Sequence, residues 1–279
     1  MYYKTILVHL DESRNVDQRI AIAASIARAD NAHLTGAAII GLQRYLYETV
    51  AMFPDDPGLA PYLDELRQRA DNVMQKFERE VRDAGLPSFE ARLIAEAPPG
   101  DFSELARCSD LVVLGQNDPN DPAIGVGPGF PDYVVLHCAR PVLVVPYSGQ
   151  FDRLAEHVLI AWNGSVEAAR AVTQAMPMMR RAQRVEVVIF RRSSQPALPG
   201  QQAGEDIRRF LARHGIDAQV MEAAIEEDAG HALLHLARDR AATLMVAGCY
   251  GHSRFRELLL GGVSRTLLRS MTVPVLMSH

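Results

Sequence analysis

The chain has 279 residues, of which 48% are hydrophobic and 23% charged, and it carries a formal net charge of −5. This composition is typical of a globular protein with room for two domains of about 140 residues each. The acidic balance argues against a nucleic acid or an anionic membrane as a partner, because no global positive field would attract either.

The N-terminal sequence MYYKTILVHLDES predicts the first strand of the fold. Its apolar run is too short for a signal core or a membrane span, and it meets charge at Asp11 and Glu12. The three cysteines are odd in number and lack C-x-x-C spacing, which indicates reduced thiols. We therefore expect a cytoplasmic protein.

The second half of the chain repeats the first. ILVHLDES (6–13) aligns with VLIAWNGS (158–165) at an offset of 152. LVVLG (111–115) aligns with LMVAG (244–248), and RPVLVVP with VPVLMSH, both at an offset of 133. Repeated apolar runs of this kind predict two copies of one folding unit.

The change of offset means that the first copy carries about 19 extra residues. We place them around residues 45–70, where Pro54, Pro57, Gly58 and Pro61 predict a loop before a long amphipathic helix that ends near Gly85. The polar segment PYSGQFDRLAE predicts a short linker between the copies. The expected domains are residues 1–149 and 150–279.

In the second copy, short apolar runs alternate with helical patterns. This alternation predicts a parallel sheet with helices on both faces, and such sheets bind ligands beyond the carboxyl ends of their strands. The expected elements are 158–162, 165–179, 185–190, 206–214, 218–223, 229–240, 244–247, 263–270 and 274–277.

A glycine-rich stretch, GCYGHSRFRELLLGGVSRTLLR (248–269), follows the penultimate strand of the second copy. It predicts a short helix over 252–260 and a second helix after Gly262. The N-terminus of a helix leaves amide groups available to an anion, and glycines allow close approach. Gly261 and Gly262 can equally serve only as a helix end and a hinge.

The first copy provides an internal comparison, because it reads GQNDPNDPAIGVGPGFPDYVVLH over the same positions. Asp118 and Asp121 stand where a polyanion would lie, and the prolines remove amide donors. Arg254, Arg256 and Arg265 have no basic counterparts. We therefore expect phosphate chemistry in the second copy alone.

These features resemble a tandem universal stress protein over residues 6–146 and 158–279. The family's nucleotide pattern is Gly, two residues, Gly, nine residues, Gly, then Ser or Thr. Gly248, Gly251 and Gly261 fit this spacing, whereas Gly262 replaces the hydroxyl residue. The resemblance implies an α/β fold with two tandem doubly wound parallel five-stranded domains, of the universal stress protein and adenine nucleotide alpha hydrolase-like class. It also implies an adenine nucleotide ligand, ATP with or without Mg²⁺.

The resemblance places the acidic residue that follows the family's first strand at Asn163 in the second copy and at Asp11 in the first. Asn163 can equally be a turn or N-cap residue. Ser264 lies two residues after Gly262 and could partly replace the missing hydroxyl. The expected cofactor-binding residues are Asn163, Gly248, Gly251, His252, Arg254, Gly261, Gly262, Val263 and Ser264.

Other sites are weaker. Glu227, His231 and His235 have metal-ligand spacing, but a charged amphipathic helix usually exposes such residues to solvent. Cys249 is expected to be a small buried thiol rather than a redox group.

The sequence contains no Walker-type phosphate loop and no positioned nucleophile, so efficient catalysis is not expected. The leading hypothesis is a stress-response sensor or regulator that binds ATP. The alternatives are a nucleotide-free interaction module that recruits an unidentified protein partner, and a weak ATPase. The family resemblance implies that the final strands of the two copies pair within one chain, giving a pseudo-dimeric monomer or a homodimer of tandem chains.

Overall fold

The computed structural model describes residues 2–40, 59–94, 100–121, 126, 127, 129–192, 203–225, 228–250 and 262–279. The chain divides into two compact units, Tyr3–Cys138 (the first unit) and Ala139–His279 (the second unit). The domain limits 1–149 and 150–279 stay a prediction. In the described part of the chain, no helix is long and apolar enough to cross a membrane.

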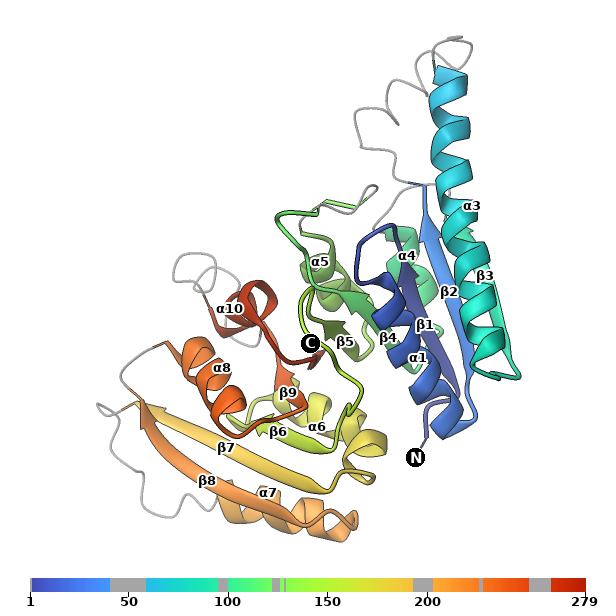
Figure 1. The fold of residues 1–279 in the computed structure, drawn as a ribbon. Helices are drawn as coiled ribbons and strands as arrows, with labels where there is room; N and C mark the ends of the chain where they lie inside the picture. The colour runs from blue at the N-terminus through green and yellow to red at the C-terminus, as the bar shows by residue number, and fades with distance from the viewer. Residues whose placement is uncertain are drawn as a thin grey trace. The chain divides into compact units, whose positions relative to one another are not determined.

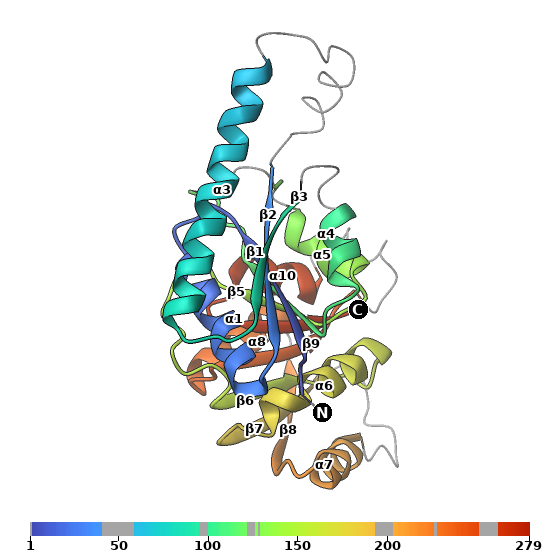
Figure 2. The same cartoon turned by 90° about the vertical axis from the view of Figure 1, so that its right-hand side faces the viewer.

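The first unit is a parallel sheet with strand order β3-β2-β1-β4. Helices α1 and α3 contact one face, and α4 and α5 contact each other on the opposite face (Figures 1 and 2). The elements are β1 Thr5–Leu10, α1 Val16–Asp30, β2 His33–Ile39, α3 Leu59–Asp83, β3 Phe89–Ile94, α4 Gly100–Ala106, β4 Leu111–Gly115 and α5 Phe130–His137.

The long helix expected in the extra segment is α3, whose buried stripe has helical spacing. Phe77 in this stripe packs over Gly36 of β2, where a Cβ would lie only 2.8 Å from the ring. The expectation that Pro61 lies in a loop was wrong. It lies in the first turn of α3, where a missing amide hydrogen costs no intrahelical bond. The stripe consists of Leu66, Ala70, Val73, Phe77 and Val81.

The second unit has strand order β5-β10-β9-β6-β7-β8, and all described neighbours except β5 and β10 are parallel. Helix α6 contacts β6, β9 and β10, α7 contacts β8, and α8 packs against α10. The elements are β5 Val142–Val145, β6 His157–Ala161, α6 Val166–Met179, β7 Arg184–Arg192, α7 Ala203–Arg213, β8 Ala218–Ile225, α8 Ala229–Asp239, β9 Leu244–Gly248, α10 Val263–Ser270 and β10 Val275–Ser278.

Strand β5 closes the first repeat in sequence but lies in the second unit in space. It pairs antiparallel with β10, with Leu143 opposite Leu276. The two final strands therefore pair within one chain. Each repeat supplies five strands within the described residues, and β8-β7-β6-β9 repeats the order β3-β2-β1-β4, which confirms the doubly wound α/β fold.

Candidate functional site

Each unit has a point where the strand order reverses, and α/β sheets bind ligands outside such points. In the first unit the reversal lies between β1 and β4, and in the second it lies between β6 and β9. The pairs Val8 with Val113 and Ala161 with Ala247 set the register there. Both switch points are therefore formed by aligned sequences, at the carboxyl ends of buried strands.

At the switch point of the second unit, the turn after β6 is held by its own side chains. Asn163 is exposed, and its Oδ1 accepts a hydrogen bond from the amide of Ser165 at 3.0 Å. Gly164 adopts φ +73°, and Ser165 caps α6 by accepting from Ala168 N at 3.2 Å. The turn role considered for Asn163 is therefore observed, and its ligand role stays a prediction.

The N-terminus of α6 also has a charge of its own. Glu167 lies in its first turn, and a hydrogen bond with its own backbone amide lowers the pKa of its carboxyl. Such a position suits a negative group, because the helix dipole and the unpaired amides favour it.

Gly248 ends β9 directly against the start of α6. A Cβ at residue 248 would lie 2.3 Å from the backbone nitrogen of Ala168 and 2.5 Å from the carbonyl carbon of Glu167. Backbone atoms cannot rotate away as a side chain can, so this position requires glycine. The first glycine of the predicted nucleotide pattern thus has a structural reason in the described fold.

The start of the glycine-rich segment is tied to α10. Tyr250 adopts φ +56°, and its amide donates to the hydroxyl of the buried Ser264 at 3.1 Å. Gly262 is the N-cap residue of α10, and Val263 is its first residue. Cys249 is 1% exposed with its sulfur 3.1 Å from the carbonyl oxygen of Ser278, which confirms the expected burial.

Several predicted residues lie outside the described residues. These include four of the nine expected binding residues and the predicted helix over 252–260. The metal candidate is incomplete for the same reason, with His231 and His235 exposed on α8. In the part of the chain that the structure describes, no group of three potential metal ligands occurs. The residues outside it are Glu227, Gly251, His252, Arg254, Arg256 and Gly261.

The switch point of the first unit holds a buried charge cluster of which the sequence analysis named only Asp11. Arg19 of α1 is 2% exposed, and its Nη2 donates to Asp11 Oδ1 at 2.6 Å. The same oxygen accepts from the amide and hydroxyl of Ser13, at 3.0 and 2.5 Å. His9, 3% exposed, places Nδ1 3.4 Å from Asp11 Oδ2.

The cluster fills the place next to Gly115. A Cβ at residue 115 would lie 2.1 Å from Nη1 of Arg19, so the arginine passes directly over this glycine. Arg19 occupies a position in the buried stripe of α1, near Val16 and Ile20. A charged residue in an apolar stripe was the sequence signal that could have revealed the cluster.

Burial and charge shift the titration of the cluster in opposite ways. Burial lowers the pKa of His9 to about 4, against the attraction of Asp11. Burial also opposes ionisation of Asp11, but the charge of Arg19, with His9 and the Ser13 hydrogen bond, holds its pKa well below the usual range. The carboxylate is therefore charged and the imidazole neutral at pH 7.

An acidic side chain also accepts a hydrogen bond from a backbone amide in the turn after β1. Asp121, in the loop after β4, accepts from the amide of Arg14 at 2.9 Å. Asp118 turns back on its own loop and accepts from Asn120 N at 2.8 Å. The backbone amide of Arg14, which precedes α1, therefore already donates to a carboxylate of the chain and is not available to an external anion.

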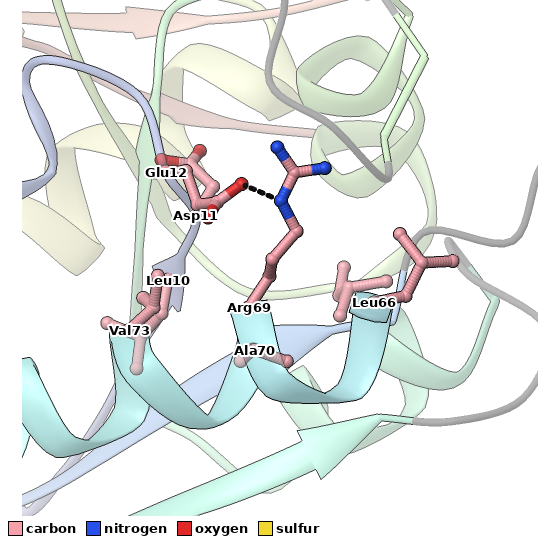
Figure 3. A pocket seen from close by; sticks show the side chains of 9 residues that line it. Leu10, Asp11, Glu12, Leu66, Arg69, Ala70 and Val73 are labelled. Atoms are coloured by element: carbon pink, nitrogen blue, oxygen red, sulfur yellow. Dashed lines mark ion pairs between the residues drawn. The ribbon is translucent and has the colours of Figure 1, made fainter. Parts of the chain in front are cut away.

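A small cavity lies at the end of β1 under α3, and Asp11 of the charge cluster is one of the residues that line it (Figure 3). Its volume is about 30 Å³, which suits one or two water molecules rather than a nucleotide. Arg69 of α3, which lines the cavity, forms an ion pair with Glu12, with Nε 3.2 Å from Oε2 (Figure 3). The lining residues are Leu10, Asp11, Glu12, Ala38, Ile39, Leu66, Arg69, Ala70 and Val73.

Comparison with known proteins assigns the second repeat to a family. The sequence pattern of the universal stress protein family matches residues 155–279. Residues 155–279 of this chain are thus similar to the universal stress protein family. The curated universal stress protein Slr1230 of Synechocystis is 23% identical over 219 residues, covering 75% of this chain and 71% of that protein. The resemblance inferred from the glycine spacing is confirmed.

Solved structures extend the likeness of fold to both repeats. A universal stress protein from Archaeoglobus fulgidus has a TM-score of 0.75 at 16% identity and covers 98% of this chain and 97% of its own. A putative universal stress protein from Pseudomonas aeruginosa has a TM-score of 0.63 at 18% identity, covering 99% and 93%. Both matches show that the tandem arrangement of this chain is a fold found in universal stress proteins.

Proposed function

We propose that the second unit binds an adenine nucleotide, ATP with or without Mg²⁺, at the carboxyl ends of β6 and β9. The observation that carries this proposal is the contrast between the two switch points. The first is filled by a buried Arg19–Asp11 pair, whereas the second has the neutral pair Asn163 and Ala171 at the aligned positions. The family match to residues 155–279 supports the same assignment.

In this proposal the base and ribose lie near Asn163, and the phosphates lie over the segment from Gly248 to Ser264. Gly251, His252, Arg254 and Gly261 supply amides and positive charge to the phosphates. Ser264 holds the start of the segment through Tyr250 N, and its hydroxyl proton can still be donated to a phosphate oxygen. In this proposal the protein is a stress-response regulator, and its signal is whether nucleotide is bound rather than whether nucleotide is hydrolysed. The chain has Gly262 at the position where the family has a hydroxyl residue.

Exchanging one residue between the two repeats tests the proposal. Gly251→Asp copies Asp118 of the first unit and places a carboxylate among the phosphates. We expect ATP affinity, measured by isothermal titration calorimetry, to fall at least tenfold, which corresponds to about 1.4 kcal/mol. The matched control is Asp118→Gly, which leaves the second unit intact and should bind ATP as the wild type does.

Equal affinity of Gly251→Asp and wild type would count against the site. Phosphate release in the presence of Mg²⁺ separates binding from turnover, and we expect it to stay at the background rate.

A further inference from the structure

We propose that the first unit contains a guanidinium-binding site at the carboxyl ends of β1 and β4, and that Arg19 of the same chain occupies it. The guanidinium group of Arg19 is buried, is held by Asp11 Oδ1 at 2.6 Å, and lies over Gly115. This inference concerns the first unit only and does not depend on nucleotide binding in the second.

The negative charge of the site comes from Asp11, whose carboxylate has contacts that do not involve Arg19. Asp11 Oδ1 is fixed by the amide and hydroxyl of Ser13, and its Oδ2 lies 3.4 Å from Nδ1 of His9. These contacts come from the turn after β1 and from β1 itself. The carboxylate therefore keeps its position when the side chain of Arg19 is removed, and it then lacks its cationic partner.

The opposite wall is shaped for a flat group. Gly115 has no Cβ, and any side chain there would meet Nη1 of Arg19 at 2.1 Å. A planar cation with several N–H donors fits such a slot, whereas a nucleotide phosphate would face the carboxylate of Asp11. The geometry thus selects small guanidinium-type cations rather than anions.

Arg19 is attached to α1, and not all of the N–H groups of its guanidinium form hydrogen bonds with the described residues. Its Nε is buried and has no partner among the residues that the structure describes. The position of Nε is fixed by the stem that leads back to α1, because Arg19 belongs to that helix. A free guanidinium ion has no such stem, so it can orient within the slot once the side chain is absent.

The test measures thermal unfolding of the full-length Arg19→Ala protein with guanidinium chloride at about 10 mM, far below the molar concentrations that unfold proteins. Sodium chloride and urea at the same concentration are the controls for ionic strength and for a neutral molecule of the same shape. We expect guanidinium alone to raise the melting temperature. A dissociation constant of about 1 mM would favour the folded state roughly tenfold.

The second repeat supplies the matched variant. Asp11→Asn with Arg19→Ala copies Asn163 and Ala171, so it removes both charges together. We expect this double variant to be more stable than Arg19→Ala and to show no response to guanidinium. Wild type, whose slot is filled, should not respond either.

An Arg19→Ala protein that responds no more than the double variant would overturn the proposal. If Arg19→Ala does not fold alone, guanidinium in the refolding buffer must recover soluble protein, and the double variant must fold without it. Failure of either would equally overturn the proposal. A loss of ATP binding in the second unit has no bearing on these outcomes.

Discussion

The two switch points have a glycine at the aligned position, but a different group packs against each of these glycines. Gly115 of the first unit accommodates the guanidinium group of Arg19, whereas Gly248 of the second accommodates the backbone of α6 at Ala168. In the first unit a side chain fills the place beside the strands, and in the second the helix itself packs there. Aligned glycines therefore do not imply a shared ligand, because each is required by a different neighbour.

Substitution of the residue that follows the first strand of each unit should give the largest difference in unfolding free energy between the units. Asp11→Ala leaves Arg19 buried without its carboxylate and should cost about 3–5 kcal/mol of unfolding free energy. Asn163→Ala removes only the exposed bond to Ser165 N and should cost about 1 kcal/mol or less. Hydrogen exchange in β1 and β6 measures the two units separately, and comparable costs would contradict the comparison.

The two glycines should respond differently to the same substitution. Gly248→Ala places a methyl group against the backbone of α6 and should cost about 3 kcal/mol. Gly115→Ala displaces Arg19, so its cost should largely disappear in the Arg19→Ala background, where no guanidinium remains. Additive costs of Gly115→Ala and Arg19→Ala in a double-mutant cycle would show that the arginine does not lie over this glycine.

The smallest of these effects concerns pH. The pKa of His9 is lowered to about 4 in the folded chain, below the usual value of about 6.5. Below pH 6.5 the unfolded chain therefore binds a proton that the folded chain does not, and stability falls until about pH 4. Between pH 7 and pH 5, the first unit should lose about 2 kcal/mol.

His9→Phe should remove this loss, because phenylalanine does not titrate and can pack against Phe102 and Phe130, whose rings contact His9. The remaining pH dependence from Asp11 appears only at lower pH, since its pKa is held well below the usual range. Exchange protection of β1 at pH 7 and pH 5 checks this. An unchanged pH dependence in His9→Phe would assign the loss to another group.

The fold was predictable because each strand is a buried apolar run and each repeat checks the other. The expected helix at 263–270 was found as α10 Val263–Ser270, and the expected strand at 244–247 as β9 Leu244–Gly248. The pairing of β5 with β10 was suggested by the family resemblance rather than by the residues of either strand. An apolar run such as Val142–Val145 predicts a buried strand but not which edge it joins.

The candidate sites were predictable only in part. Glycine spacing pointed to the segment after β9, and the contact of Gly248 with α6 gives its first glycine a physical reason. The apolar stripe of α1 could have marked Arg19 as an unusual buried charge. Its pairing with Asp11 could not be derived from the sequence, because only the tertiary fold brings the two residues together next to Gly115. The absence of a phosphate site in the first repeat stays a prediction; beside Gly115 of that repeat the structure places the guanidinium group of Arg19.

The most direct test of the account is a map of amide hydrogen exchange across the whole chain, with and without saturating ATP. We predict slower exchange at residues 161–168 and 248–264 of the second unit, with no change at residues 9–19 and 115–121 of the first. Protection at the Arg19–Asp11 cluster, or unchanged exchange in both units, would contradict it.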